Sequence, residues 1–213
     1  ANRRARVSLW LFATLFILSL FAELIANDKP IIMQYDGQWY FPMLVDYPET
    51  EFDGFLPTRT DYLDPFVQQQ IDDHGWALWP IIPFSYQTLD MNMTRPSPAP
   101  PDSRHWLGTD DQGRDVTARV IYGFRLSVAF ALALTAGSLV VGVVVGGVQG
   151  YFGGKIDLIG QRFTEIWSGL PVLFLLIILA SFVQPGFWWL LVIMLLFSWL
   201  GLATVGVTLV HVG

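Results

Sequence analysis

The chain has 213 residues, of which 53% are hydrophobic and 14% are charged; because soluble domains carry about 25% charged residues, this composition favours a membrane protein over a soluble one. The net charge of −6 comes from one polar segment, since 15 of the 18 acidic residues but only 6 of the 12 basic ones lie between Asp28 and Arg119. An acidic segment argues against binding of nucleic acid, whose phosphates need Lys and Arg, and the absence of Cys leaves the redox compartment open.

The first apolar run covers residues 7–26 and is long enough to cross a membrane, since a spanning helix needs about 20 apolar residues. Its one charged residue, Glu23, lies near the end of the run, where a carboxylate reaches water. Arg3, Arg4 and Arg6 precede the run, which predicts a cytoplasmic N-terminus. A cleaved signal peptide is the alternative, but the run is long for one and no small-x-small site follows. We interpret residues 1–26 as a cytoplasmic N-terminus and a first transmembrane helix.

Residues 27–104 form a polar insert, which the sequence predicts to be a small mixed α/β module outside the cytoplasm. Asp36-Gly37 separates two short runs, residues 31–35 and 38–41, and is a strong signal for a two-residue hairpin turn. The insert is too aromatic for a disordered linker. Because of their large apolar area, we expect Trp39 and Trp76 to be its most buried residues.

A short helix is predicted in the second half of the insert. Asp64 suits the N-cap, Pro65 suits the first helical position, and Gly75 follows as a helix terminator. Residues 96–101 read Pro-Ser-Pro-Ala-Pro-Pro and predict an extended spacer. The insert is therefore expected to be a folded cap followed by a stiff strap.

Residues 105–125 are predicted to form a polar loop and a helix along the membrane surface. Asp110 and Asp111 suggest calcium, but the alternating ligands of an EF-hand are missing, and turns select Asp and Gly, so a turn is favoured. The arginines of this segment either pair locally or contact another subunit. The residues that we single out here are His105, Leu107, Gly108, Thr109, Asp110, Gly113, Arg114, Asp115, Arg119, Gly123 and Arg125.

Residues 126–213 are expected to form the transmembrane core, beginning with a second crossing over residues 126–150. Gly142, Gly146 and Gly150 recur at four-residue spacing and therefore share one helix face. Small residues on one face let a second helix approach closely in lipid, although glycine is also generally common in membrane helices. We interpret the three glycines as a helix-packing face.

The third and fourth crossings are predicted over residues 163–183 and 187–205. Gln184-Pro185-Gly186 leaves room only for a tight turn, so these two helices should form an antiparallel hairpin. Pro171 should kink the third helix or mark its true start. The fold class is therefore an all-α polytopic membrane protein with four transmembrane helices, interrupted by the α/β insert after the first.

The sequence offers little that is typical of catalysis or of cofactor binding. His74, His105 and His211 are far apart and have no partner at metal-ligand spacing. Gly153-Gly154-Lys155 suggests a phosphate loop, but the first glycine of that motif and the Ser or Thr after its lysine are both missing. We therefore predict no catalytic residue, metal site or cofactor on this chain.

The loop and its flanks fit the pattern HxLGTDxxGRDVxxRxxxGxRxS, and this pattern resembles the signature of permease subunits in dipeptide, oligopeptide and nickel ABC importers. Ile25-Ala26-Asn27-Asp28-Lys29-Pro30, Tyr35-Asp36-Gly37 and Trp39-Tyr40-Phe41-Pro42 look like the Yej-type oligopeptide permeases, a subfamily that imports peptides and peptide-like antibiotics such as microcin C. The resemblance covers residues 7–201. It implies a non-enzymatic inner-membrane permease subunit for peptides.

The resemblance further implies partners: a second permease subunit, two ATPase subunits and a periplasmic substrate-binding protein, all working in membrane lipid. One alternative is a membrane-anchored outer domain that binds a ligand or partner, although four crossings are more than an anchor requires. A channel is a second alternative, but the sequence lacks the rings of charged residues or the selectivity-filter motif that such pores use.

The last twelve residues depart from the family pattern. Family members follow the fourth crossing with a charged cytoplasmic loop that docks on the ATPase, whereas residues 202–213 contain no Arg, Lys, Glu or Asp. We therefore expect a fragment, or a sequence altered or ended early after Gly201. On that basis these 213 residues should not couple to an ATPase or support transport alone.

Overall fold

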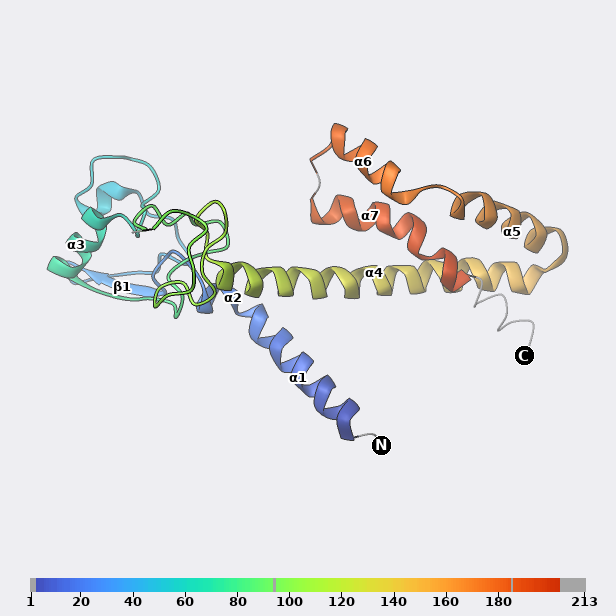
Figure 1. The fold of residues 1–213 in the computed structure, drawn as a ribbon, viewed down its shortest axis with the longest axis horizontal. Helices are drawn as coiled ribbons and strands as arrows, with labels where there is room; N and C mark the ends of the chain where they lie inside the picture. Colours follow the sequence, from blue (N-terminus) through green and yellow to red (C-terminus); the bar gives the residue numbers. More distant parts are fainter. Residues whose placement is uncertain (1–2, 94, 185, 204–213) are drawn as a thin grey trace. The chain divides into compact units, whose positions relative to one another are not determined.

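The computed structural model describes residues 3–93, 95–184 and 186–203, and its contacts divide the chain into two compact units at Leu126. Figure 1 shows the order of the elements. Each unit is considered by itself. The predictions that concern Pro185 and the uncharged tail from residue 204 onward lie outside the described residues.

The first unit begins with α1 (Arg3–Leu20), an 18-residue helix. The predicted first crossing, residues 7–26, is not one continuous helix. It is interrupted at Phe21, which has φ −96° and ψ 28°, and continues as the short α2 (Ala22–Ile25). Most of the apolar side chains of α1 are exposed, as is expected for a helix whose surroundings are lipid or other helices.

A three-stranded antiparallel sheet lies in the polar insert, in the order β2-β1-β3. Its strands are β1 (Ile32–Tyr35), β2 (Gln38–Tyr40) and β3 (Gly75–Leu78). The predicted hairpin is confirmed, because Tyr35 pairs with Gln38 across the turn. Asp36 and Gly37 have φ of +46° and +78°, the positive values that the tight turns of hairpins require at both positions.

A short 3₁₀ helix, η1 (Glu49–Phe52), and α3 (Pro65–His74) pack with the sheet, and Figure 1 shows α3 beside it. The predicted ends of α3 are confirmed. Asp64 caps the helix by accepting a hydrogen bond from the Phe66 amide at 2.8 Å, and Gly75 follows its last residue. The core between these elements consists of Met33, Tyr35, Phe52, Tyr62, Val67 and Ile71.

The expectation that Trp39 and Trp76 are the most buried residues of the insert is wrong. Their exposed fractions are 57% and 46%. Successive side chains of a strand point to opposite faces, and Met33 and Tyr35 fill the core face, so Gln34 points the other way. Both tryptophans pair with Gln34 across the sheet and contact each other edge to face on this outer side, with ring centroids 5.7 Å apart.

Helix α4 (Val116–Phe152) has 37 residues and is about 55 Å long at 1.5 Å per residue. The predicted surface helix over the first part of this segment is wrong as a separate element. Residues 116–125 are the first turns of the same continuous helix, because no proline separates them from the apolar run. The division between the two units falls within α4.

The second unit continues with α5 (Gly154–Ser168), α6 (Val172–Phe182) and α7 (Phe187–Ser198). Helices α5 and α6 meet at a bend of 68°, which is visible in Figure 1. The predicted effect of Pro171 is confirmed, because this residue is the N-cap of α6 and marks its start. The predicted third crossing therefore comprises the end of α5, the bend and α6.

Helix α7 packs against α4 in the parallel direction. Phe187 contacts Phe130 edge to face, with ring centroids 5.6 Å apart, and further along both helices Ser198 and Ser138 share a hydrogen bond. Within the described residues, α4 alone is long and apolar enough to cross a membrane by itself, and α5 with α6 adds a second span if the bent pair counts as one. Helix α7, with its apolar continuation to Ala203, is shorter.

Candidate functional site

The signature loop folds back onto the proline-rich strap. The Thr109 amide donates to the Ala99 carbonyl at 3.0 Å, and the Ala99 amide donates to Thr109 Oγ1 at 2.9 Å. Gly108 has φ +76°, and a Cβ at this position would lie 2.4 Å from the Ala99 oxygen. Only glycine satisfies both constraints, so this glycine allows the close contact between loop and strap.

Asp110 is the centre of hydrogen bonding within the loop. Its carboxylate accepts bonds from the Gln112 amide at 2.9 Å, from the Arg114 amide at 3.0 Å and from Arg114 Nε at 2.8 Å, and it also pairs with Arg119. Burial raises the pKa of Asp110, but the hydrogen bonds from Arg114 and its other partners outweigh this effect and lower the pKa to about 2. The predicted turn at Asp110 is confirmed, because the Gly113 amide closes it on the Asp110 carbonyl.

His105 lies in a buried network between two carboxylates. Its Nδ1 is 2.8 Å from Asp115 Oδ2, and its Nε2 is 3.1 Å from Asp90 Oδ2, while the exposed fractions of the three side chains are 3% or less. The imidazole stacks on Phe84 with centroids 4.5 Å apart, and Arg104 approaches Asp90 at 3.4 Å. Each ring nitrogen therefore has one carboxylate oxygen within hydrogen-bonding distance.

Asp115 connects this network to α4. Its second oxygen, Oδ1, accepts the Ala118 amide at 2.7 Å, which makes Asp115 the cap of the helix that begins at Val116. A carboxylate at a helix N-terminus is also favoured by the helix dipole. One carboxylate therefore fixes both the buried histidine and the start of the long apolar helix.

The sequence analysis missed this network, because it assigned no partner to His105. In the structure Arg114, the neighbour of Asp115, pairs with Asp110. Asp90 precedes His105 by 15 residues and lies outside the loop motif, so no local spacing relates the two. The pairing forms only after the strap has folded back.

Arg125, a further signature residue, also pairs within the first unit, and the alternative of a contact with another subunit stays a prediction. Arg125 forms an ion pair with Glu23 of α2 at 2.8 Å and lies 5.1 Å from the ring centre of Tyr122. The Tyr122 hydroxyl donates to the Ala26 carbonyl at 2.9 Å. A Cβ added to Gly123 would meet no atom within 4 Å. These contacts attach the first turns of α4 to the junction between α2 and the insert.

The glycine face lies on α4 in the second unit. Gly142 approaches the chain just after α7 so closely that an added Cβ would lie 2.5 Å from Leu202 Cβ and 3.2 Å from the Trp199 oxygen. Gly146 is buried and Gly150 is half-buried. Gly137, one turn earlier, faces Leu195 of α7.

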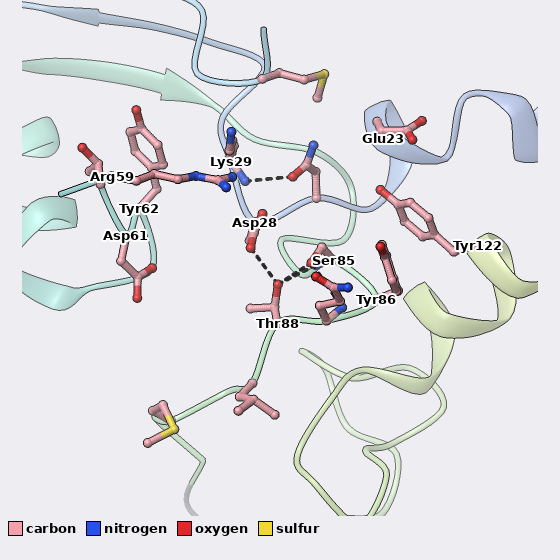
Figure 2. Close-up of a pocket in the computed structure, with 16 residues that line it drawn as sticks. Glu23, Asp28, Lys29, Arg59, Asp61, Tyr62, Ser85, Tyr86, Thr88 and Tyr122 are labelled. Carbon is pink, nitrogen blue, oxygen red and sulfur yellow. Dashed lines mark hydrogen bonds between the residues drawn. The ribbon is translucent and has the colours of Figure 1, made fainter. Parts of the chain in front are cut away.

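A groove with a volume of about 720 Å³ lies in the first unit (Figure 2). Six segments line it: Glu23 of α2, the α2–β1 connection, Met43 between β2 and η1, the loop before α3, residues 85–91 and the second turn of α4. Asp28 accepts a hydrogen bond from the Thr88 hydroxyl at 2.8 Å, and Thr88 shares another with Ser85 at 2.7 Å. Lys29 and Arg59 both pair with Asp46. The groove therefore presents both carboxylates and cations.

A metal-binding role receives no support from the part of the chain that the structure describes, where no three His, Cys, Asp or Glu side chains converge as a ligand set. The groups that do converge, around Asp110 and around His105, bind each other and the backbone. Their geometry fits a role in positioning the start of α4.

Comparison with known proteins places the chain among membrane transport components. Residues 138–209 match the family described as binding-protein-dependent transport system inner membrane component. The chain is 53% identical, over 96% of its length and 60% of the relative's, to the inner membrane ABC transporter permease protein YejE of Escherichia coli strain K12. It is 51% identical, over 94% of its length and 59% of the relative's, to the peptidoglycan transport system permease protein YejE of Agrobacterium fabrum.

More distant similarity reaches the dipeptide transport system permease protein DppC of Bacillus subtilis, which is 40% identical over 50% of this chain and 33% of that protein. The chain is therefore a homologue of these YejE permease proteins along nearly its whole length. It spans about 60% of the length of these two YejE relatives. The resemblance read from the signature motif is confirmed.

Proposed function

We propose that this chain is the membrane-spanning permease subunit of an ABC importer that moves oligopeptides or peptide-like compounds across the bacterial inner membrane. The observation that carries the proposal is its identity with two YejE permeases along almost all of its sequence. These two relatives are named for ABC transport and for peptidoglycan transport, and the DppC relative is named for dipeptide transport. Peptides and peptidoglycan fragments share the peptide chemistry that we propose for the substrate.

The proposed partners follow from this role. A second permease subunit would complete the pathway, two ATPase subunits would hydrolyse ATP, and a periplasmic binding protein would deliver the substrate. The chain itself would contribute no catalytic residue or cofactor. Gly142, Gly146 and Gly150 are proposed as a helix-packing face within this assembly, which the close approach of Gly142 to Leu202 supports.

We further propose four crossings with a cytoplasmic N-terminus, so that the α/β insert lies in the periplasm. The parallel course of α4 and α7 supports this arrangement, because both helices would then run from outside to inside. Since the sequence has no Cys, a single cysteine reports one position cleanly. Ser97→Cys should react with a membrane-impermeant maleimide in intact spheroplasts, whereas Gln161→Cys should react only after lysis. The reverse pattern would refute the orientation.

Co-purification separates this function from the alternative of a membrane-anchored outer binding domain. We expect the affinity-tagged product of the complete native gene to retain an ABC ATPase and a second permease in mild detergent. An anchored binding domain would retain neither of them. Recovery of the folded, membrane-inserted protein without any ATPase would contradict the proposed function.

A further inference from the structure

We propose that the groove in Figure 2 is a peptide-binding site on the polar insert, which binds the charged ends of a short zwitterionic peptide. The inference rests on the proposed transport of peptides and adds a binding site outside the transmembrane helices. Its volume of about 720 Å³ is typical of small-molecule sites, which measure about 300–1,000 Å³.

The first observation is that two carboxylates facing the groove have no cationic partner among the described residues. Asp28 Oδ2 accepts the Thr88 hydroxyl, and Asp61 Oδ1 accepts the Leu63 amide at 3.0 Å. Each retains a second oxygen. A peptide ammonium group carries three donors and one positive charge, so it suits these acceptors.

The second observation is that two cations in the same groove share one carboxylate. Lys29 and Arg59 share the single carboxylate of Asp46. Arg59 reaches Asp46 through Nε at 3.1 Å, and no described residue is bonded to its two terminal amino groups. Figure 2 shows its guanidinium extending toward Lys29 along the groove. A guanidinium with free terminal nitrogens can bind a carboxylate by two parallel hydrogen bonds.

The third observation is that the rest of the groove lining suits a peptide chain. Tyr86 and Tyr122 contact each other with tilted rings whose centroids are 4.8 Å apart, and both line the groove with Met91. Asn27 and Gln87 add amide groups that can both donate to and accept from a peptide backbone. Charges of both signs around a partly apolar wall fit a zwitterionic peptide better than a simple anion or cation.

The groove also connects the parts of the first unit that position α4. Tyr122 belongs to α4, and Glu23, which pairs with Arg125 of α4, lines the same groove. A bound peptide would contact the insert and the first turns of this helix together. The site is therefore suited to sensing a peptide that arrives at the outer end of the helix.

The test is binding of the tripeptide trialanine to the purified full chain in nanodiscs, measured by isothermal titration calorimetry. N-acetyl-trialanine and trialanine amide, which each lack one charged end, should bind at least tenfold more weakly. Asp61→Asn should weaken trialanine at least tenfold and leave the N-acetyl peptide unchanged. Arg59→Gln should also weaken the binding of trialanine at least tenfold and leave the binding of trialanine amide unchanged.

Matched controls lie outside the groove. Asp73→Asn and Arg95→Gln change the same charges on exposed residues and should leave binding unchanged. Circular dichroism establishes that each variant is folded. Three results would each overturn the proposal. They are equal binding of all three peptides, an equal loss of trialanine binding in the control and groove variants, and no binding of trialanine by the folded protein.

The outcome is separable from that of the proposed function. Co-purification of an ATPase and peptide uptake by cells do not require a peptide site on this insert. If the chain retains its ATPase but the folded protein binds no trialanine, the site fails and the permease function stands. If no ATPase is retained, the permease function itself fails.

Discussion

Removing the carboxylate of Asp115 should loosen the start of α4 by an amount that the structure allows us to work out. The Asp115→Ala change deletes the cap of the Ala118 amide, which is worth about 1 kcal/mol. It also deletes a buried, charge-assisted hydrogen bond to His105, worth about 1.5–3 kcal/mol. The sum is about 2.5–4 kcal/mol of local stability.

The Asp115→Asn change should cost much less, because an amide can serve both neighbours. Its oxygen can still accept the Ala118 amide, and asparagine is as good an N-cap as aspartate. Its NH₂ can donate to His105 Nδ1 if the imidazole is neutral, and Nε2 can then donate to Asp90. Only the charge assistance is lost, so we expect a cost of about 1 kcal/mol.

Hydrogen exchange measured by mass spectrometry reads this difference directly. At a factor of ten for every 1.4 kcal/mol, exchange in a peptide covering residues 105–120 should accelerate about 60- to 700-fold in Asp115→Ala and about fivefold in Asp115→Asn. Asp111→Asn is the matched control, because Asp111 is exposed in the same loop. If Asp115→Ala exchanges no faster than this control, the proposed role of the network is wrong.

Three further predictions concern the loop and the glycine face. Gly142→Ala should cost about 1–3 kcal/mol, because the new Cβ would lie 2.5 Å from a side-chain atom of the chain just after α7, whereas Gly147→Ala, with no atom within 4 Å, should be neutral or stabilising; thermal unfolding in detergent measures both. Gly108→Ala should destabilise the first unit more than Gly37→Ala, since both have positive φ but only Gly108 also meets a backbone oxygen, at 2.4 Å; equal shifts in unfolding temperature would contradict this. Asp110 has a lowered pKa of about 2, so its contribution to stability is complete above the usual pKa of about 4 and is lost as pH falls from about 4 toward 2. The protection of the loop amides, measured relative to the intrinsic exchange rate at each pH, should fall over that interval, and a flat profile would count against the ion pairs.

Features that depend on a few adjacent residues were predictable from the sequence. Asp36 and Gly37 tolerate the positive φ values that a two-residue hairpin needs, so these two residues alone predicted the turn. Asp64 with Pro65 determined the start of α3, and Pro171 determined the start of α6. In each case the physical cause lies within one turn of the chain.

Features that depend on distant packing were not predictable. The alternation of side chains along β1 and β2 predicts which residues share a face of the sheet. It does not predict which face is buried, because η1 and α3 cover that face only in the folded insert, and Trp39 lies on the other one. The partners of His105 include Asp90, which the folded strap brings to it. The sequence also did not predict that residues 116–125 belong to α4. Their polar composition differs from that of the apolar segment that follows, yet both form one continuous helix.

The number of membrane crossings is predicted from hydropathy and still depends on how bent helices are counted. Residues 163–183 are apolar enough for one span, yet the structure divides this stretch at Pro171 with a 68° bend. A hydropathy profile averages over a window of residues and does not report the direction of the helix axis, so it cannot detect a bend. Maleimide labelling of single cysteines on both sides of this bend determines whether α5 and α6 form one crossing.

The central claim, that this chain is the permease subunit of a peptide importer, is tested most directly by uptake. The gene that encodes the chain is deleted in a host that lacks other peptide importers, and entry of radiolabelled trialanine is measured with and without re-expression of that gene. We predict that deletion abolishes uptake and that re-expression restores it. Uptake that continues at the original rate after deletion would contradict the claim.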